Sequence, residues 1–170
     1  MRIKDIVLIS MMSAMLVCVQ VALGFLPNIE LVSLLIILFT IQYGKKTIYI
    51  IYVFVLLEGL IYGFHLWWIN YLYVWDVLFI IALIFKKERS PVFWAVVSGM
   101  YGLSYGALCS IPYFFMGGFP TALAYWFNGI PFDIPHGIGN FIIALVLFTP
   151  LNRLLQFINS RRDPLQNPFD

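Results

Sequence analysis

Apolar residues are arranged along the chain in six long runs, which are separated by short polar or Gly- and Pro-containing breaks. The runs are Ile6–Leu26, Leu31–Tyr43, Thr47–Tyr62, Trp67–Phe85, Val92–Met116 and His136–Ile158. A helix that spans a bilayer needs about 20 apolar residues, with a range of ~17–25. The second run is short, so its helix is expected to be tilted, broken or extended at its ends. The pattern predicts an all-α integral membrane protein with a six-transmembrane-helix bundle, and five or seven helices are the alternatives.

The segments beside these runs predict how the chain is organised. Gly and Pro residues within Gly117–Pro135 argue against a spanning helix there, and a short interfacial helix is expected only around Thr121–Asn128. Such a loop is able to open and would act as a gate. The first run begins like a signal peptide, but it is long enough to span and lacks an Ala-x-Ala-like cleavage site, so we interpret it as a retained helix. Residues 1–158 are predicted to form one membrane domain, and residues 159–170 a polar tail.

The basic residues predict the orientation of the bundle. Every Lys and Arg lies before the first run, between the second and third, between the fourth and fifth, or at the end of the sixth. They are Arg2, Lys4, Lys45, Lys46, Lys86, Lys87, Arg89, Arg153, Arg161 and Arg162. With six helices all of them fall on one side, which the positive-inside rule makes cytoplasmic. We therefore expect a multi-pass membrane protein with both termini on the cytoplasmic side.

Composition supports the membrane assignment and excludes several functions. The chain is 62% hydrophobic and only 11% charged, whereas soluble domains average about 25% charged residues. It has no basic stripe of the kind that binds nucleic acid. It also has no nucleotide-binding glycine motif and no metal-ligand spacing, so we expect no cofactor, no resident metal and no catalytic residues. Cys18 and Cys109 lie in apolar runs and are interpreted as small buried hydrophobic residues.

Polar groups gather instead in the predicted outward half of the bundle. Ionisable side chains inside a bilayer are costly and usually face the bundle interior or a wet cavity. The carboxylates there are Glu30, Glu58, Asp76 and Asp133, and His136 and Asn140 lie at the same level. A structural role is the alternative for each, and for Glu30 the start of the second helix is the favoured interpretation.

Aromatic residues are concentrated in Tyr62–Asp76. Its first half suits an interfacial aromatic belt. At 100° per residue, the stripe formed by Trp68, Tyr71, Trp75 and Asp76 shares one helix face and is predicted to face a ligand.

Small residues four apart give a third signal, because they let helices approach closely in lipid. Gly102 and Gly106 are predicted to pack inside the bundle. Ser10, Ser13 and Ala14 on the first helix are candidates for contact with a partner protein.

The chain resembles the substrate-binding S-components of energy-coupling factor (ECF) vitamin transporters. The resemblance rests on the six-helix pattern, on the stretches LPNIELVSLLIIL and YVFVLLEGLIYGFHLWW, and on the small-residue spacing of Ser10–Ala14, where the family has Ala at both positions. It implies a protein of the bacterial cytoplasmic membrane that captures a vitamin outside, docks on a transmembrane coupling subunit through the first helix, and is powered by two cytoplasmic ATPases.

The predicted outer side lacks Lys and Arg, so a ligand with a free carboxylate or phosphate would lack a cationic partner. Neutral or cationic vitamins, such as cobalamin and thiamin-like or pyridoxamine-like compounds, are favoured over biotin, folate and pantothenate. Among them cobalamin is favoured, because a wide ligand would suit an aromatic-rich outer rim with glycine hinges. Metal-specific relatives carry His at the second position, where this chain has Arg2. The predicted binding residues are Glu58, Trp67, Trp68, Tyr71, Trp75, Asp76, Asp133, His136 and Asn140. The alternatives are a stand-alone transporter or intramembrane enzyme that uses Glu58, Asp76 and His136, and an assembly subunit without a ligand.

Overall fold

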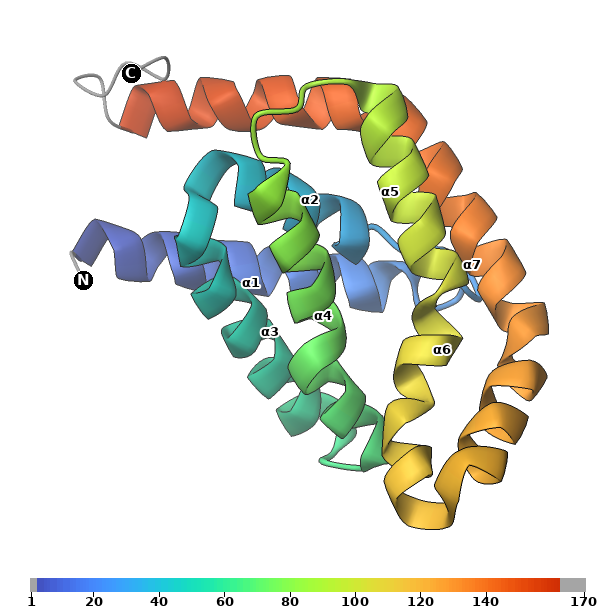
Figure 1. Ribbon diagram of the computed structural model, residues 1–170. Helices are drawn as coiled ribbons and strands as arrows, with labels where there is room; N and C mark the ends of the chain where they lie inside the picture. Colours follow the sequence, from blue (N-terminus) through green and yellow to red (C-terminus); the bar gives the residue numbers. More distant parts are fainter. Residues whose placement is uncertain (1–2, 163–170) are drawn as a thin grey trace.

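The computed structural model describes residues 3–162, and every regular element in that range is helical (Figure 1). The elements are α1 (Ile3–Leu23), α2 (Val32–Tyr43), the 3₁₀ turn η1 (Gly44–Lys46), α3 (Thr47–Tyr62), α4 (Leu66–Ile84), α5 (Pro91–Leu103), α6 (Tyr105–Cys109) and α7 (Ile111–Arg162). The predicted all-α class is thereby confirmed. Arg2 and most of the predicted tail, residues 163–170, lie outside the described range.

Several of these helices are long and apolar enough to cross a membrane. The qualifying stretches are Ile3–Leu23, Val32–Tyr62, Leu66–Ile84 and Ile111–Ser160, and α5 is a shorter apolar helix. Large apolar side chains also cover much of the surface; Ile3 and Phe115, for example, are each 81% exposed. Extended apolar surface is unusual on a soluble monomer. The helices are therefore compatible with a membrane bundle.

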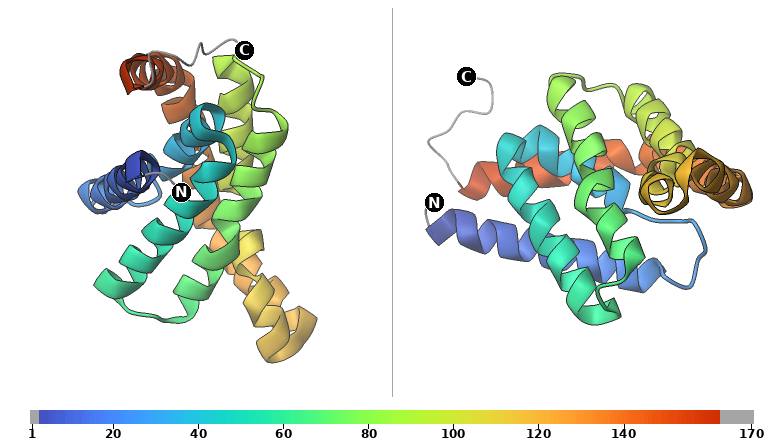
Figure 2. Two further views of the ribbon diagram at one scale, coloured as in Figure 1. Left: turned by 90° about the vertical axis from the view of Figure 1, so that its left-hand side faces the viewer. Right: turned by 60° about the horizontal axis from the view of Figure 1, so that its bottom comes forward.

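The connections between helices lie on two opposite sides of the molecule. Figure 1 places the start of α1, the end of α7 and the α2–α3 and α4–α5 connections toward one side. The α1–α2 loop, the α3–α4 turn and the kink at Gly117–Gly118 lie toward the other side. The α3–α4 pair is an antiparallel hairpin in both views of Figure 2. Its turn begins at Gly63, whose φ of +88° favours glycine. The side that holds the start of α1 and the α2–α3 and α4–α5 connections also carries basic residues, such as Lys45, Lys46 and Lys86, and we call it the basic side.

Helix α2 forms the centre of the bundle. All nine residues from Val32 to Thr40 are buried, and a helix that is apolar all round is expected inside a protein. The helix has only 12 residues, and its sides contact α3, α4 and α7. Trp94, Phe54 and Phe148 are fully buried around it, and the Trp94 and Phe148 rings stack at 6.2 Å.

Polar contacts join the helices near the basic side. The Lys46 ammonium lies 2.9 Å from the Asp5 carboxylate and links the α2–α3 connection to α1. Nearby, the Gln42 amide donates to Asn152 Oδ1 at 2.7 Å and links α2 to α7.

The segment from Val92 to Pro135 differs from its prediction. The fifth run is divided into α5, α6 and the first turns of α7, and the expected loop Gly117–Pro135 is helical apart from Gly117 and Gly118. Gly118 has φ of +74° and turns the chain back on itself. Pro120 lies two residues farther on, in the first turn of the helix, where a missing N–H costs little. Prolines farther along interrupt the hydrogen bonding of α7 without ending it, and Figure 1 shows the helix changing direction along its length. The predicted loop at Gly117–Pro135 was therefore wrong, and so was the predicted start of the last helix at His136.

The α5–α7 contact depends on glycine, as predicted for Gly102. A Cβ added to Gly102 would lie 2.9 Å from both the Cα of Gly137 and the carbonyl oxygen of His136. Backbone atoms cannot rotate away as a side chain can. The two helices would have to separate to admit a methyl group.

We expect Gly102→Ala to destabilise the protein by about 1–3 kcal/mol, the usual cost of overpacking. Thermal unfolding of the purified protein in detergent measures the effect. Gly139→Ala is the matched control, because its Cβ would meet its nearest neighbour, the Asn28 carbonyl oxygen, at an ordinary 3.4 Å. Equal melting temperatures for the two variants would contradict the proposed tight contact.

Candidate functional site: a polar and aromatic cavity

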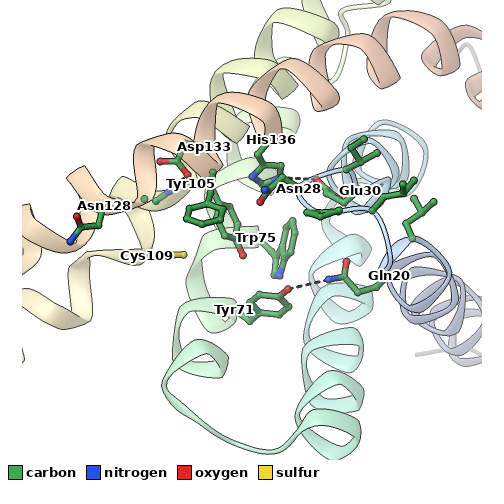
Figure 3. A pocket seen from close by; sticks show the side chains of 18 of the residues that line it. Gln20, Asn28, Glu30, Tyr71, Trp75, Tyr105, Cys109, Asn128, Asp133 and His136 are labelled. Atoms are coloured by element: carbon green, nitrogen blue, oxygen red, sulfur yellow. Dashed lines mark hydrogen bonds and ion pairs between the residues drawn. The ribbon is translucent and has the colours of Figure 1, made fainter.

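A cavity of about 600 Å³ lies on the side of the molecule away from the basic residues. The α1–α2 loop, α4, α6 and α7 surround it, and the end of α1 completes its wall (Figure 3). Its lining consists of Gln20, Leu23, Gly24, Leu26, Pro27, Asn28, Ile29, Glu30, Tyr71, Trp75, Tyr105, Gly106, Cys109, Tyr125, Asn128, Gly129, Phe132, Asp133 and His136. The walls thus combine aromatic rings with a few hydrogen-bonding groups, which is the usual composition of a small-molecule site.

Helix α4 supplies two aromatic rings to the cavity. Tyr71 and Trp75 are one helical turn apart, and their rings meet edge to face at 5.4 Å. Gln20 approaches from α1 and donates to the Tyr71 hydroxyl at 3.4 Å. Trp75 is only 2% exposed, yet its indole N–H has no acceptor among the described residues. A buried donor without a partner is costly, so this N–H is available to a bound molecule.

Asp133 is held in place by the backbone of α6. Its Oδ1 accepts the Gly106 N–H at 3.0 Å, whereas Oδ2 has no hydrogen-bond partner among residues 3–162. The contact requires glycine at position 106, because an added Cβ would overlap the Asp133 carboxylate. The side chain is therefore fixed through one oxygen and has the other free.

Glu30 and His136 form the second polar group of the cavity. Glu30 Oε2 accepts the Ser33 N–H at 2.8 Å, which caps the start of α2 as predicted. Its Oε1 lies 3.5 Å from His136 Nε2, a distance that fits an ion pair better than a short hydrogen bond. Burial raises the pKa of the Glu30 carboxyl, but His136 and Ser33 lower it by more, so the net pKa lies below its ordinary value. The His136 ring also packs edge to face on Tyr105 at 5.0 Å.

Four of the residues predicted from the sequence line this cavity together. Tyr71 and Trp75 come from α4, and Asp133 and His136 come from α7. Trp67 lies just outside and packs edge to face on Tyr71 at 5.1 Å.

The other predicted binding residues lie elsewhere and contact the protein itself. The Trp68 indole donates to the Val55 carbonyl at 2.9 Å, and Asp76 accepts from the Tyr52 hydroxyl at 2.7 Å. Asn140 donates to Ser33 Oγ at 3.4 Å, which links α7 to α2. Glu58 is 2% exposed, and its Oε1 has no hydrogen-bond partner among the described residues. Thus the stripe along α4 divides, with Tyr71 and Trp75 toward the cavity and Trp68 and Asp76 away from it.

Sequence reasoning missed several lining residues. Tyr105 and Gly106 reach the cavity because α5 ends at Leu103 and α6 begins at Tyr105, a break inside an apolar run that periodicity does not reveal. Gln20 did offer a signal, because it is the one amide side chain in the first run. A polar residue inside a spanning segment usually faces the bundle interior.

The predicted docking residues divide between two faces of α1. Ser10 and Ala14 are exposed, as are Met11 and Met15 beside them. Ser13 is buried and donates to the Ile50 carbonyl of α3 at 2.9 Å. Cys18 is also exposed, so its predicted burial was wrong, whereas Cys109 is buried as predicted.

No group of three or more His, Cys, Asp or Glu side chains within residues 3–162 is placed to hold a metal ion. Comparison with known proteins found no relative: no protein-family model matches the chain, and no curated protein or solved structure matches it significantly.

Proposed function

We propose that the protein is the substrate-binding S-component of an ECF-type importer in the bacterial cytoplasmic membrane. In this proposal six segments span the bilayer: α1, α2, α3, α4, the stretch from α5 to Met116, and α7 from Phe119 onward. The basic side is cytoplasmic, as the positive-inside rule indicates. Both termini would then be inside, and the cavity would open toward the outer face.

The observation that carries the proposal is the cavity itself. It lies on the side opposite the basic residues, and its walls combine aromatic rings with buried polar atoms that have no hydrogen-bond partner within residues 3–162. The chain has no nucleotide-binding motif of its own, which suits a subunit that borrows its power from separate ATPases. The exposed small residues Ser10 and Ala14 offer a surface for close contact with a coupling subunit.

The cavity volume bears on the choice of vitamin. Small-molecule sites usually occupy about 300–1,000 Å³ for drug-sized ligands, and this cavity falls within that range. Its size favours a ligand smaller than cobalamin, the vitamin that the sequence favoured.

The alternative enzyme or stand-alone transporter would use Glu58, Asp76 and His136 together. Of these three side chains only His136 lines the cavity, and Asp76 is bonded to Tyr52 instead. No observation on the described residues favours this alternative.

Calorimetric titration of the protein in lipid nanodiscs with a panel of vitamins tests the proposal. We expect one vitamin to bind with a dissociation constant well below 10 μM, which corresponds to a free energy more favourable than about −7 kcal/mol. If no vitamin binds this tightly, the proposed function is wrong. An assembly subunit without a ligand is the outcome that such a result would favour.

A further inference from the structure

The charges in the cavity are unbalanced. Its lining includes two carboxylates, Glu30 and Asp133, and contains no Lys or Arg. His136 is the one lining side chain that can carry a positive charge. It lies within ion-pair distance of Glu30 only. One protonated imidazole can compensate one of the two negative charges, so Asp133 has no cation of its own.

Each carboxylate is held in a way that leaves one oxygen free of the backbone. Glu30 uses Oε2 for the Ser33 N–H, and Asp133 uses Oδ1 for the Gly106 N–H. Asp133 is only 6% exposed, and its Oδ2 has no hydrogen-bond partner among the described residues. An unpaired charge in a buried place is strongly unfavourable. A ligand that brings a positive charge would remove this penalty, whereas a neutral donor would leave the charge uncompensated.

The rest of the wall suits a flat cation. Trp75 lies 6.2 Å from Tyr105 and 5.4 Å from Tyr71, measured between ring centroids. Cations are attracted to the faces of such rings, and Trp binds them best. Figure 3 shows Asp133 and Glu30 on the two sides of His136, with Trp75 and Tyr105 beside it. Charged oxygens and aromatic rings therefore line the same space.

We propose that the cavity selects a small organic cation with a planar ring. The positive group of this ligand binds Asp133 Oδ2, whose negative charge His136 does not balance. The planar ring of the ligand lies against Trp75 and Tyr105. This inference rests on the function proposed above and names the chemical class of its substrate. It assigns the recognition of charge to Asp133, which is on α7, and excludes Asp76 on α4 from it.

Two vitamins that differ in one group provide the test. Pyridoxamine carries a protonated amine where pyridoxine carries a neutral hydroxyl. Thiamine is a second cation, biotin and pantothenate are anions, and cobalamin is a large ligand. Affinities are measured by calorimetry at pH 7.5 in nanodiscs. We expect the tightest ligand to be a cation, and pyridoxamine to bind at least about tenfold tighter than pyridoxine, as for a hydrogen bond to a charged group.

Variants then locate the charge. In Asp133→Asn the remaining oxygen can still accept the Gly106 N–H, so the fold is preserved. The affinity for the cation is expected to fall by about 10- to 100-fold, and the affinity for pyridoxine to change less than about threefold. Asp76→Asn is the matched control and should leave both affinities unchanged. Circular dichroism and thermal unfolding check that both variants are folded.

The outcomes separate this inference from the proposed function. If a neutral or anionic vitamin binds most tightly, the selection of a cation is wrong while the importer subunit stands. The inference is also wrong, and the proposed function again stands, if Asp76→Asn weakens binding of the cation more than Asp133→Asn does. If no vitamin in the panel binds below 10 μM, the proposed function fails and this inference fails with it.

Discussion

Replacing Ser10 and Ala14 together by leucine is expected to abolish co-purification of the coupling subunit and its two ATPases. Both side chains are exposed on α1, where small residues permit close approach of a partner helix. Each added leucine side chain would overfill such a contact at a cost of about 1–3 kcal/mol, so the pair should weaken the complex by about 30-fold or more. Co-expression with the coupling module of the source organism, followed by affinity purification, measures the loss.

Two controls make this result specific to docking. Ala22→Leu adds the same side chain at an exposed position farther along α1 and should leave the complex intact. Vitamin binding by the double variant should stay unchanged, because neither Ser10 nor Ala14 lines the cavity. Survival of the complex in the double variant would show that this face of α1 is not the docking surface. Ser13→Leu is unsuitable for the experiment, since Ser13 is buried against α3.

Gly106→Ala is expected to weaken ligand binding about as strongly as the loss of Asp133. An added methyl group would overlap the Asp133 carboxylate, whose Oδ1 accepts the Gly106 N–H. The side chain would have to leave its position, and a well-placed charged hydrogen bond is worth about 1.5–3 kcal/mol. We therefore expect a loss of affinity of about tenfold or more, measured by the same calorimetric titration.

Gly139→Ala is again the matched control, since it lies outside the cavity lining and its Cβ makes only ordinary contacts. The affinity of this variant for the vitamin should stay within about twofold of that of the original protein. Substitutions that create no clash and touch no binding group usually change free energies by less than about 0.5 kcal/mol. In a Gly106→Ala, Asp133→Asn double variant the two losses should not add, because both act on one carboxylate. Additive losses would mean that Gly106 acts through something other than Asp133.

Hydrophobic patterning predicted much of the fold. The third run, Thr47–Tyr62, coincides with α3, and the runs for α2 and α4 are displaced by one residue at most. Charged or glycine residues bound the second and third runs at both ends and follow the fourth run, so these ends are clear. Prediction was wrong where Gly and Pro occur inside a helix. In α7 only Gly117 and Gly118 leave the helical conformation, whereas the prolines beyond them are accommodated by bends.

The cavity was harder to predict than the helices. Periodicity correctly grouped Tyr71 with Trp75 on one side of α4, but it also included Trp68 and Asp76, which bond to α3 instead. The helical period shows which residues of α4 share a face. It does not show whether each of them contacts another helix or the cavity. Tyr105 and Glu30 lie in the cavity because of a helix break and a loop path, and both depend on tertiary packing.

Helix α1 holds the exposed Ser10 and Ala14 and also the cavity residues Gln20 and Leu23. Ala14 and Gln20 are about 9 Å apart along the axis at 1.5 Å per residue. If one rigid element serves both surfaces, their equilibria are thermodynamically linked. Whatever factor the bound vitamin applies to the affinity for the coupling subunit, the coupling subunit must apply to the affinity for the vitamin. If docking weakens vitamin binding and so releases the cargo, the vitamin-loaded protein must bind the coupling subunit more weakly than the empty protein does, by the same factor. Helix α1 would be the element that the two sites share.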